Sequence, residues 1–200
     1  MDVYEAIKTR RSTRKFKKEP VARDALEKIV EAGRLAPCGG NSQSTRFIVI
    51  QSGEALREIA ELACNAFARM EITDNMYKSM LSIVKACKKG FFAFHYDAPV
   101  LIVLANKIGY GNAMADSVCA AMNMMLVANE LDLGSCYINS LRWLTDEPTV
   151  REYLTKLGLG EDETVCASVA LGTADTADGL PNRNQRKITG NPVNYIMSAQ

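Results

Sequence analysis

The chain has 200 residues, of which 48% are hydrophobic and 24% are charged. This balance is close to the average of globular proteins and excludes a disordered, collagen-like or coiled-coil chain. The length fits a single domain over residues 1–200. The apolar run Pro99 to Ala105 is too short to span a bilayer, and the polar start lacks the apolar core of a signal peptide. We therefore expect a cytoplasmic protein with no membrane partner.

The predicted elements alternate between helices and strands. Residues 21–35 form the clearest amphipathic helix, which ends at the breaker cluster 36–41. Ser52 can cap the next helix, and Asn112 can cap a long helix to about Glu130 that is apolar on most sides. The other expected elements are a short helix over 2–8, a strand over 47–50, a helical candidate lid over 70–90, strands over 100–105 and 134–138, a helix over 145–157 and a strand over 165–171.

Cysteine and histidine usage argues against metal sites and against catalysis by protein side chains alone. The six cysteines form no CxxC pair and no cluster with the single histidine, His95, so zinc, iron–sulfur and thioredoxin-like motifs lack support. We expect reduced, mostly buried thiols, such as Cys119 and Cys166 in their apolar runs. One histidine cannot build a multi-histidine metal site, and a structural role for it is the commoner one. An enzyme of this composition is expected to rely on a bound cofactor.

Positive charge gathers near the two chain ends, although the formal net charge is only +1. Residues 8–18 hold seven basic residues and no acid, which leaves 17 basic against 23 acidic residues elsewhere. Arg183, Arg186 and Lys187 form a second basic group. A solvated surface, a nucleic-acid contact and a phosphate pocket supplied by both chain ends all explain this pattern. Nucleic-acid binding is disfavoured because little aromatic interleaving accompanies the charge and the overall pI is not basic, so no nucleic-acid partner is expected.

Three segments carry residues suited to a cofactor. The first, residues 10–16, reads Arg-Arg-Ser-Thr-Arg-Lys-Phe, and its guanidinium and hydroxyl groups suit a phosphate. The second, residues 37–43, combines small residues that let the backbone approach a flat ligand with amide side chains. The third, residues 133–140, is a strand that runs into a polar turn. Taken singly, a solvated turn, a helix-to-strand connection and a plain strand end explain them at least as well.

Together and in this order, the segments resemble the nitroreductase family of flavin enzymes, over nearly the whole chain. The motifs that carry the resemblance are Arg-Arg-Ser-x-Arg-x-Phe, Ala-Pro-x-Gly-Gly-Asn-x-Gln before a Phe-Ile-Val-Ile strand, Asp-Ala-Pro-Val, Leu-Gly-Ser-Cys and a late Arg-Lys. The resemblance implies an α+β fold, in which helices surround a mixed, mainly antiparallel central sheet. It also implies an intertwined homodimer with two FMN molecules at its interface. Residues 173–200 would then form a C-terminal extension that wraps the partner subunit.

The resemblance further implies the residues that hold the flavin. The FMN phosphate would be bound by Arg10, Ser12 and Arg14, with Arg11 beside them and Arg183, Arg186 and Lys187 added from the tail. The ring would meet, from the partner subunit, Pro37, Cys38, Gly39 and Asn41. Asn139 and Ser140 would present backbone N–H groups near flavin N5. The chain departs from the family at Cys38, where Ser is common, and in an aromatic stretch that lacks the usual amide contact: Phe91, Phe92, Phe94 and Tyr96.

The function that this resemblance implies is that of an FMN-dependent oxidoreductase. NADH or NADPH would reduce the flavin, which would then reduce a small-molecule acceptor in the same slot, such as a nitroaromatic or a quinone. Neither a metal nor a catalytic side chain is required. Two alternatives stay open: a specialised flavin reaction such as reductive dehalogenation or enone reduction, and a flavin-binding or redox-sensing protein with little turnover.

Overall fold

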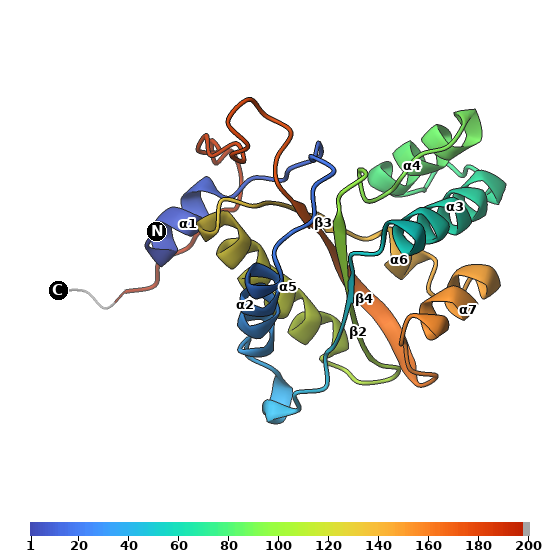
Figure 1. Cartoon of the computed structure of the whole chain (residues 1–200). Coiled ribbons are helices and arrows are strands. Elements are labelled where there is room, and N and C mark those ends of the chain that lie inside the picture. The colour runs from blue at the N-terminus through green and yellow to red at the C-terminus, as the bar shows by residue number, and fades with distance from the viewer. Residues whose placement is uncertain (198–200) are drawn as a thin grey trace.

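A four-stranded antiparallel sheet lies between two layers of helices (Figure 1) in the computed structural model, which describes residues 1–197. The last three residues of the expected C-terminal extension, 198–200, lie outside this described part. The strand order is β1-β2-β4-β3, and the strands are β1 (Arg46–Ile50), β2 (Val100–Lys107), β3 (Gly134–Ile138) and β4 (Glu163–Gly172). The expected α+β fold with a mainly antiparallel sheet is confirmed. A parallel contact also occurs, as an isolated bridge between Ser12 and Ser135.

Helices cover both faces of the sheet. One layer contains α1 (Val3–Thr9), α2 (Arg23–Arg34) and α5 (Ala113–Glu130), and the other contains α3 (Gly53–Arg69), α4 (Lys78–Lys89), α6 (Ser140–Trp143) and α7 (Pro148–Lys156). A short 3-10 turn, Gly39–Asn41, joins α2 to β1. None of the helices in the described range 1–197 has the length and apolarity needed to cross a membrane.

Strand periodicity explains why there are two hydrophobic cores. Successive side chains of a strand point to opposite faces of its sheet. Along β2, Leu101 and Val103 pack with the α3–α4–α7 side, whereas Ile102 and Leu104 pack with α2 and α5. All four side chains are fully buried. The continuous apolar run therefore supplies both cores, which makes β2 a central strand.

Most predicted elements are observed within a few residues of their expected bounds. Of the two predicted helix caps, one forms the expected hydrogen bond. The Ser52 hydroxyl oxygen accepts a hydrogen bond from the Ala55 N–H at 3.3 Å, as expected of a cap. Asn112 occupies the cap position of α5, but its side chain makes no capping hydrogen bond. The thiol of Cys119 is exposed, so the expectation that it is buried is wrong.

Two predicted helices begin later than the sequence pattern indicated. The segment 70–90 is helical only from Lys78. The helix expected over 145–157 begins at Pro148, because the Glu147 carboxylate caps it by accepting the Val150 N–H at 3.0 Å. The short helix α6 before it was not predicted.

Candidate functional site

The basic segment, residues 10–16, lies against the start of β3. The Thr13 N–H donates to the Ser135 carbonyl oxygen at 2.9 Å. A Cβ atom on Gly134 would stand 2.6 Å from the Thr13 hydroxyl oxygen, so this close approach requires glycine. Further along, Phe16 pairs with Ala174 just beyond β4. The segment is therefore fixed at the end of the sheet where β3 begins and β4 ends.

Like charges crowd together in this segment. Burial and the neighbouring Arg11 both lower the pKa of Arg10. The Arg11 guanidinium donates through Nη1 to the Arg10 carbonyl oxygen at 2.6 Å, while its Nη2 is buried without a partner. Within residues 1–197, no carboxylate forms an ion pair with Arg10, Arg11 or Arg14. An unpaired buried donor is costly, so this cluster is suited to an anion such as a phosphate.

The Cys136 thiol on β3 marks the point where three of the predicted phosphate ligands converge. Burial raises the pKa of this thiol, and Arg14, Ser12 and Arg10 oppose the rise. The Arg14 guanidinium also lies over the Tyr96 ring, 5.8 Å from its centroid. Burial by itself would lower the pKa of Arg14, but Tyr96 and Cys136 raise it. The structure thus brings together Arg10, Ser12 and Arg14 as the sequence led us to expect.

The turn, residues 37–43, is organised around a buried carboxylate. Both oxygens of Asp116 accept the Gly39 N–H, at 3.1 and 3.3 Å. The Tyr110 hydroxyl lies 3.0 Å from Asp116 Oδ2 and 3.1 Å from the Gly39 carbonyl oxygen. The Gln43 amide donates to Asn41 Oδ1 at 3.1 Å, so the two amide side chains support each other on the surface.

Sequence reasoning missed Asp116 and Tyr110 as residues that shape this turn. Asp116 is 6% exposed and sits within a helix whose other buried residues are mostly apolar. A buried carboxylate must be paired or hydrogen-bonded. An acid inside an otherwise apolar helix was therefore the signal that could have identified it.

A hollow of about 480 Å³ opens beside this turn. This volume is in the range of small-ligand pockets. Its wall includes three of the predicted flavin contacts, Pro37, Cys38 and Asn41, together with Gln43, Phe47 and Asp116.

The basic segment and the turn lie at opposite ends of the sheet (Figure 1). The turn precedes Arg46, which pairs with Ala105 near the end of β2, whereas the basic segment adjoins Gly134, which pairs with Gly172. The β2 strand between these ends has eight residues, which corresponds to about 26 Å. One chain therefore does not bring the two predicted halves of the flavin site together.

Asn139 and Ser140 lie at the far end of β3 from the basic segment. β3 has five residues, a length of about 16 Å. Asn139 precedes α6 without capping it, and its Oδ1 atom is buried with no partner. Both ends of β3 thus carry unsatisfied polar groups, as expected beside an elongated polar ligand.

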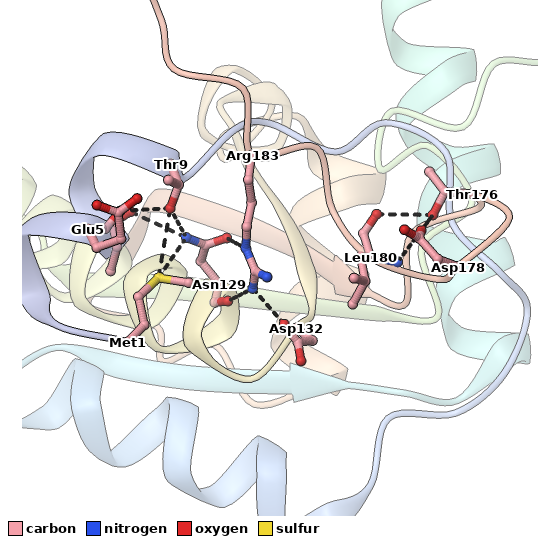
Figure 2. Close-up of polar contacts among 10 residues, drawn as sticks. Met1, Glu5, Thr9, Asn129, Asp132, Thr176, Asp178, Leu180 and Arg183 are labelled. Carbon is pink, nitrogen blue, oxygen red and sulfur yellow. Dashed lines mark hydrogen bonds and ion pairs between the residues drawn. The ribbon is translucent and has the colours of Figure 1, made fainter.

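The predicted tail residues are placed differently from one another. Figure 2 shows Arg183 bound to the end of α5: its guanidinium donates to Asp132 Oδ1 at 2.6 Å and to Asn129 Oδ1 at 3.3 Å. The Asn129 amide in turn donates to Thr9 Oγ1 at 3.1 Å. A phosphate role for Arg183 would require this network to open. Arg186 and Lys187 are exposed, and their phosphate role stays a prediction.

The chain belongs to the nitroreductase family, whose family model matches residues 7–173. A crystal structure of a Bacteroides fragilis nitroreductase with bound FMN is similar, with a TM-score of 0.85, 31% identity, and coverage of 98% of this chain and 100% of that chain. An FMN-bound nitroreductase structure from Desulfitobacterium hafniense gives a TM-score of 0.81 at 25% identity, covering 98% and 100%.

Curated relatives agree with this assignment. An NADH dehydrogenase/NAD(P)H nitroreductase of Methanothermobacter thermautotrophicus is 30% identical over 68% of this chain, which spans 60% of that relative's length. Staphylococcus epidermidis NADPH-dependent oxidoreductase is matched over 58% of its length at 27% identity, covering 76% of this chain. A nitrobenzene nitroreductase of Ectopseudomonas oleovorans is 27% identical over 94% of this chain and 92% of its own length.

Proposed function

We propose that this nitroreductase-family protein is an FMN-dependent oxidoreductase that uses NADH or NADPH as its electron donor. The observation that carries the proposal is the convergence of Arg10, Ser12 and Arg14 at the start of β3, with a buried Arg11 nitrogen that has no partner. A cationic cluster without a carboxylate is what a phosphate group requires.

The residues present fit FMN. Arg10, Arg11, Ser12 and Arg14 would hold its phosphate, and the end of β3 at Asn139 and Ser140 would meet its ring. When bound, FMN supplies two-electron redox chemistry, accepting hydride from the nicotinamide and passing electrons to an acceptor. The protein's part is to bind and orient the reactants. His95 is buried, and no step is assigned to it.

The acceptor class follows from the relatives. We propose nitroaromatics and quinones, because a nitrobenzene nitroreductase is similar over nearly the whole chain. Purified protein incubated with FMN and desalted should be yellow, and should oxidise NADH or NADPH when nitrofurazone or menadione is added. A protein that stays colourless would overturn the proposal. Bound flavin without turnover would instead favour a flavin-binding or redox-sensing role.

We further propose a homodimer in which the flavin lies between subunits, with Pro37, Cys38, Gly39 and Asn41 supplied by the partner. Two surfaces of one chain are unusually apolar. On α5, Val118 and Met122 are exposed, and in the tail Tyr195 and Ile196 are 83% and 99% exposed. Large exposed apolar surfaces usually mark partner sites. We expect the tail, beginning near residue 173, to wrap the partner.

Truncation after Asp178 tests this assembly, because it removes the apolar tail and its basic residues. The truncated chain should lose dimerisation and flavin together. Light scattering with flavin absorbance recorded on the same peak measures both. A truncated protein that remains dimeric and yellow would contradict the wrapped tail.

A further inference from the structure

A second hollow, of about 510 Å³, lies outside the residues assigned to the flavin. It is formed where the start of α3 meets the segment 91–99 and residues 18–20. Its lining residues include Lys18, Gln51, Arg57, Phe91, His95 and Asp97. The volume is sufficient for a small organic ligand.

The single histidine of the chain, His95, forms part of the wall of this hollow. His95 is 4% exposed, and its Nδ1 atom is buried and unpaired. Within residues 1–197, the hydrogen bond that His95 makes is a backbone one, in which its carbonyl oxygen accepts the Ala98 N–H at 3.2 Å. Buried polar side chains are nearly always satisfied. Because Nδ1 has no exposed surface, a ligand in the hollow would lie beside the imidazole, whose NMR signals would report on it.

The polar groups around the histidine favour a ligand with one negative charge. Lys18 and Arg57 are cationic and Asp97 is anionic, which leaves a net charge of +1. The ion pair that Arg57 makes with Glu61 on the same helix is long, at 3.9 Å. Gln51 uses its oxygen to accept the Val21 N–H at 2.9 Å, so its amide nitrogen remains free to donate. A monoanion such as a carboxylate matches this set better than a doubly charged phosphate.

The remaining wall is apolar and includes an exposed aromatic ring. Phe91 is 62% exposed, although phenylalanine is usually buried. Leu56, Ala60 and Pro99 complete the apolar side. A flat apolar body would gain contact area against this ring.

We propose that this hollow binds a small aromatic carboxylate, with its ring against Phe91, its carboxylate toward Lys18 and Arg57, and its body beside His95. Phe91 and Asp97 also line the neighbouring hollow that contains Arg14. The ligand would thus bind beside the proposed phosphate site and separately from it. Binding at this site requires no turnover, so it is testable whether or not the proposed oxidoreductase activity is observed.

The unique histidine makes a direct test possible. The probe is 4-hydroxybenzoate, and its neutral control is 4-hydroxybenzamide, each titrated into the protein as purified while the imidazole NMR signals of His95 are recorded. We expect saturable shifts with the acid and binding of the amide weakened by about tenfold. Burial lowers the pKa of His95, so a carboxylate bound nearby should raise it.

Variants separate the site from a general charge effect. Arg57→Gln and Lys18→Gln should each weaken the acid by about threefold and together by about tenfold. Arg23→Gln is the matched control, because Arg23 is an exposed arginine on α2 with its own ion pair to Glu27. It should leave binding unchanged. Thermal melting confirms that each variant is folded.

Four outcomes would overturn the proposal. They are equal binding of the acid and the amide, no shift of the His95 signals at millimolar probe, acid binding that survives the double substitution, and release of FMN in proportion to the acid bound. The last outcome would place the probe in the phosphate cluster instead.

Discussion

The basic segment and the turn differ in what holds them, although both are expected to contact the same flavin. The basic segment is cationic and is fixed by backbone pairing between Thr13 and Ser135. The turn is fixed by one buried carboxylate, Asp116, which accepts the Gly39 N–H. The first leaves its charged side chains free for a ligand, and the second uses its charge internally and offers amides and backbone.

Their separation matters as much as their chemistry. Because they lie at opposite ends of the sheet, each chain would offer half of the proposed site at either end. Two such chains packed antiparallel about a twofold axis would complete two equivalent sites. The predictions below test this arrangement, from the largest expected effect to the smallest.

Mixing two defective variants should restore flavin binding. One variant carries Arg10→Ala and Arg14→Ala, and the other carries Pro37→Glu and Asn41→Glu, at positions exposed in this structure. If the halves come from different chains, a random mixture should recover about a quarter of the sites, because each heterodimer keeps one intact site. Flavin absorbance after co-expression and purification measures this. Sites built within one chain would give no recovery.

Single substitutions in the basic segment should discriminate between flavins. Arg10→Ala or Arg14→Ala should weaken FMN by about ten- to a hundredfold, since each removes a charge-assisted contact to phosphate. Riboflavin, which lacks the phosphate, should be affected far less. Fluorescence titration gives both affinities. Equal losses for both ligands would show that these arginines act through fold stability alone.

Substitution of the buried carboxylate should give the opposite pattern. Asp116→Asn weakens the acceptors for the Gly39 N–H and should destabilise the protein by about 1–3 kcal/mol. Flavin affinity should fall to a similar extent for FMN and riboflavin, because the turn is expected to meet the ring. Tyr110→Phe is the milder companion, with a loss of about 0.5–1.5 kcal/mol. A loss of affinity for FMN but not for riboflavin would contradict the expectation that the turn meets the ring and the basic segment meets the phosphate.

The last effect is on stability and concerns how the basic segment is held against β3. Gly134→Ala would push its methyl group onto the Thr13 side chain and should cost about 1–3 kcal/mol of unfolding free energy. Gly111→Ala is the matched control, because nothing lies within 4 Å of its Cβ position. Chemical denaturation compares the two. Similar denaturation midpoints for the two variants would mean that the start of β3 shifts to make room for the methyl group. The close contact between Gly134 and Thr13 would then not be what fixes the basic segment.

Local patterns were enough to predict the sheet and most helices. The apolar run after Pro99 and the helical spacing over 21–35 depend on neighbours within a few residues, and both were observed. The short helix α6 was not predicted. The start of α7 at Pro148 was not predicted either, because a cap by Glu147 outweighs the apolar pattern before it. The prediction that the Cys119 thiol is buried was also wrong, because hydropathy does not show which side of an apolar helix remains exposed.

The sequence by itself determined the chemistry that the chain can offer: a basic cluster at residues 10–14 that is suited to a phosphate, a turn of small residues and amides, and a strand end at Asn139. Only the tertiary structure decided which of these groups meet. Strand register places the basic segment at one end of the sheet and the turn at the other, and it leaves Arg183 bound to Asp132. Contacts between distant segments depend on how strands pair and helices pack. Local sequence patterns do not show these long-range contacts. The same packing left the His95 Nδ1 atom buried, with no hydrogen-bond partner among residues 1–197, beside an open hollow.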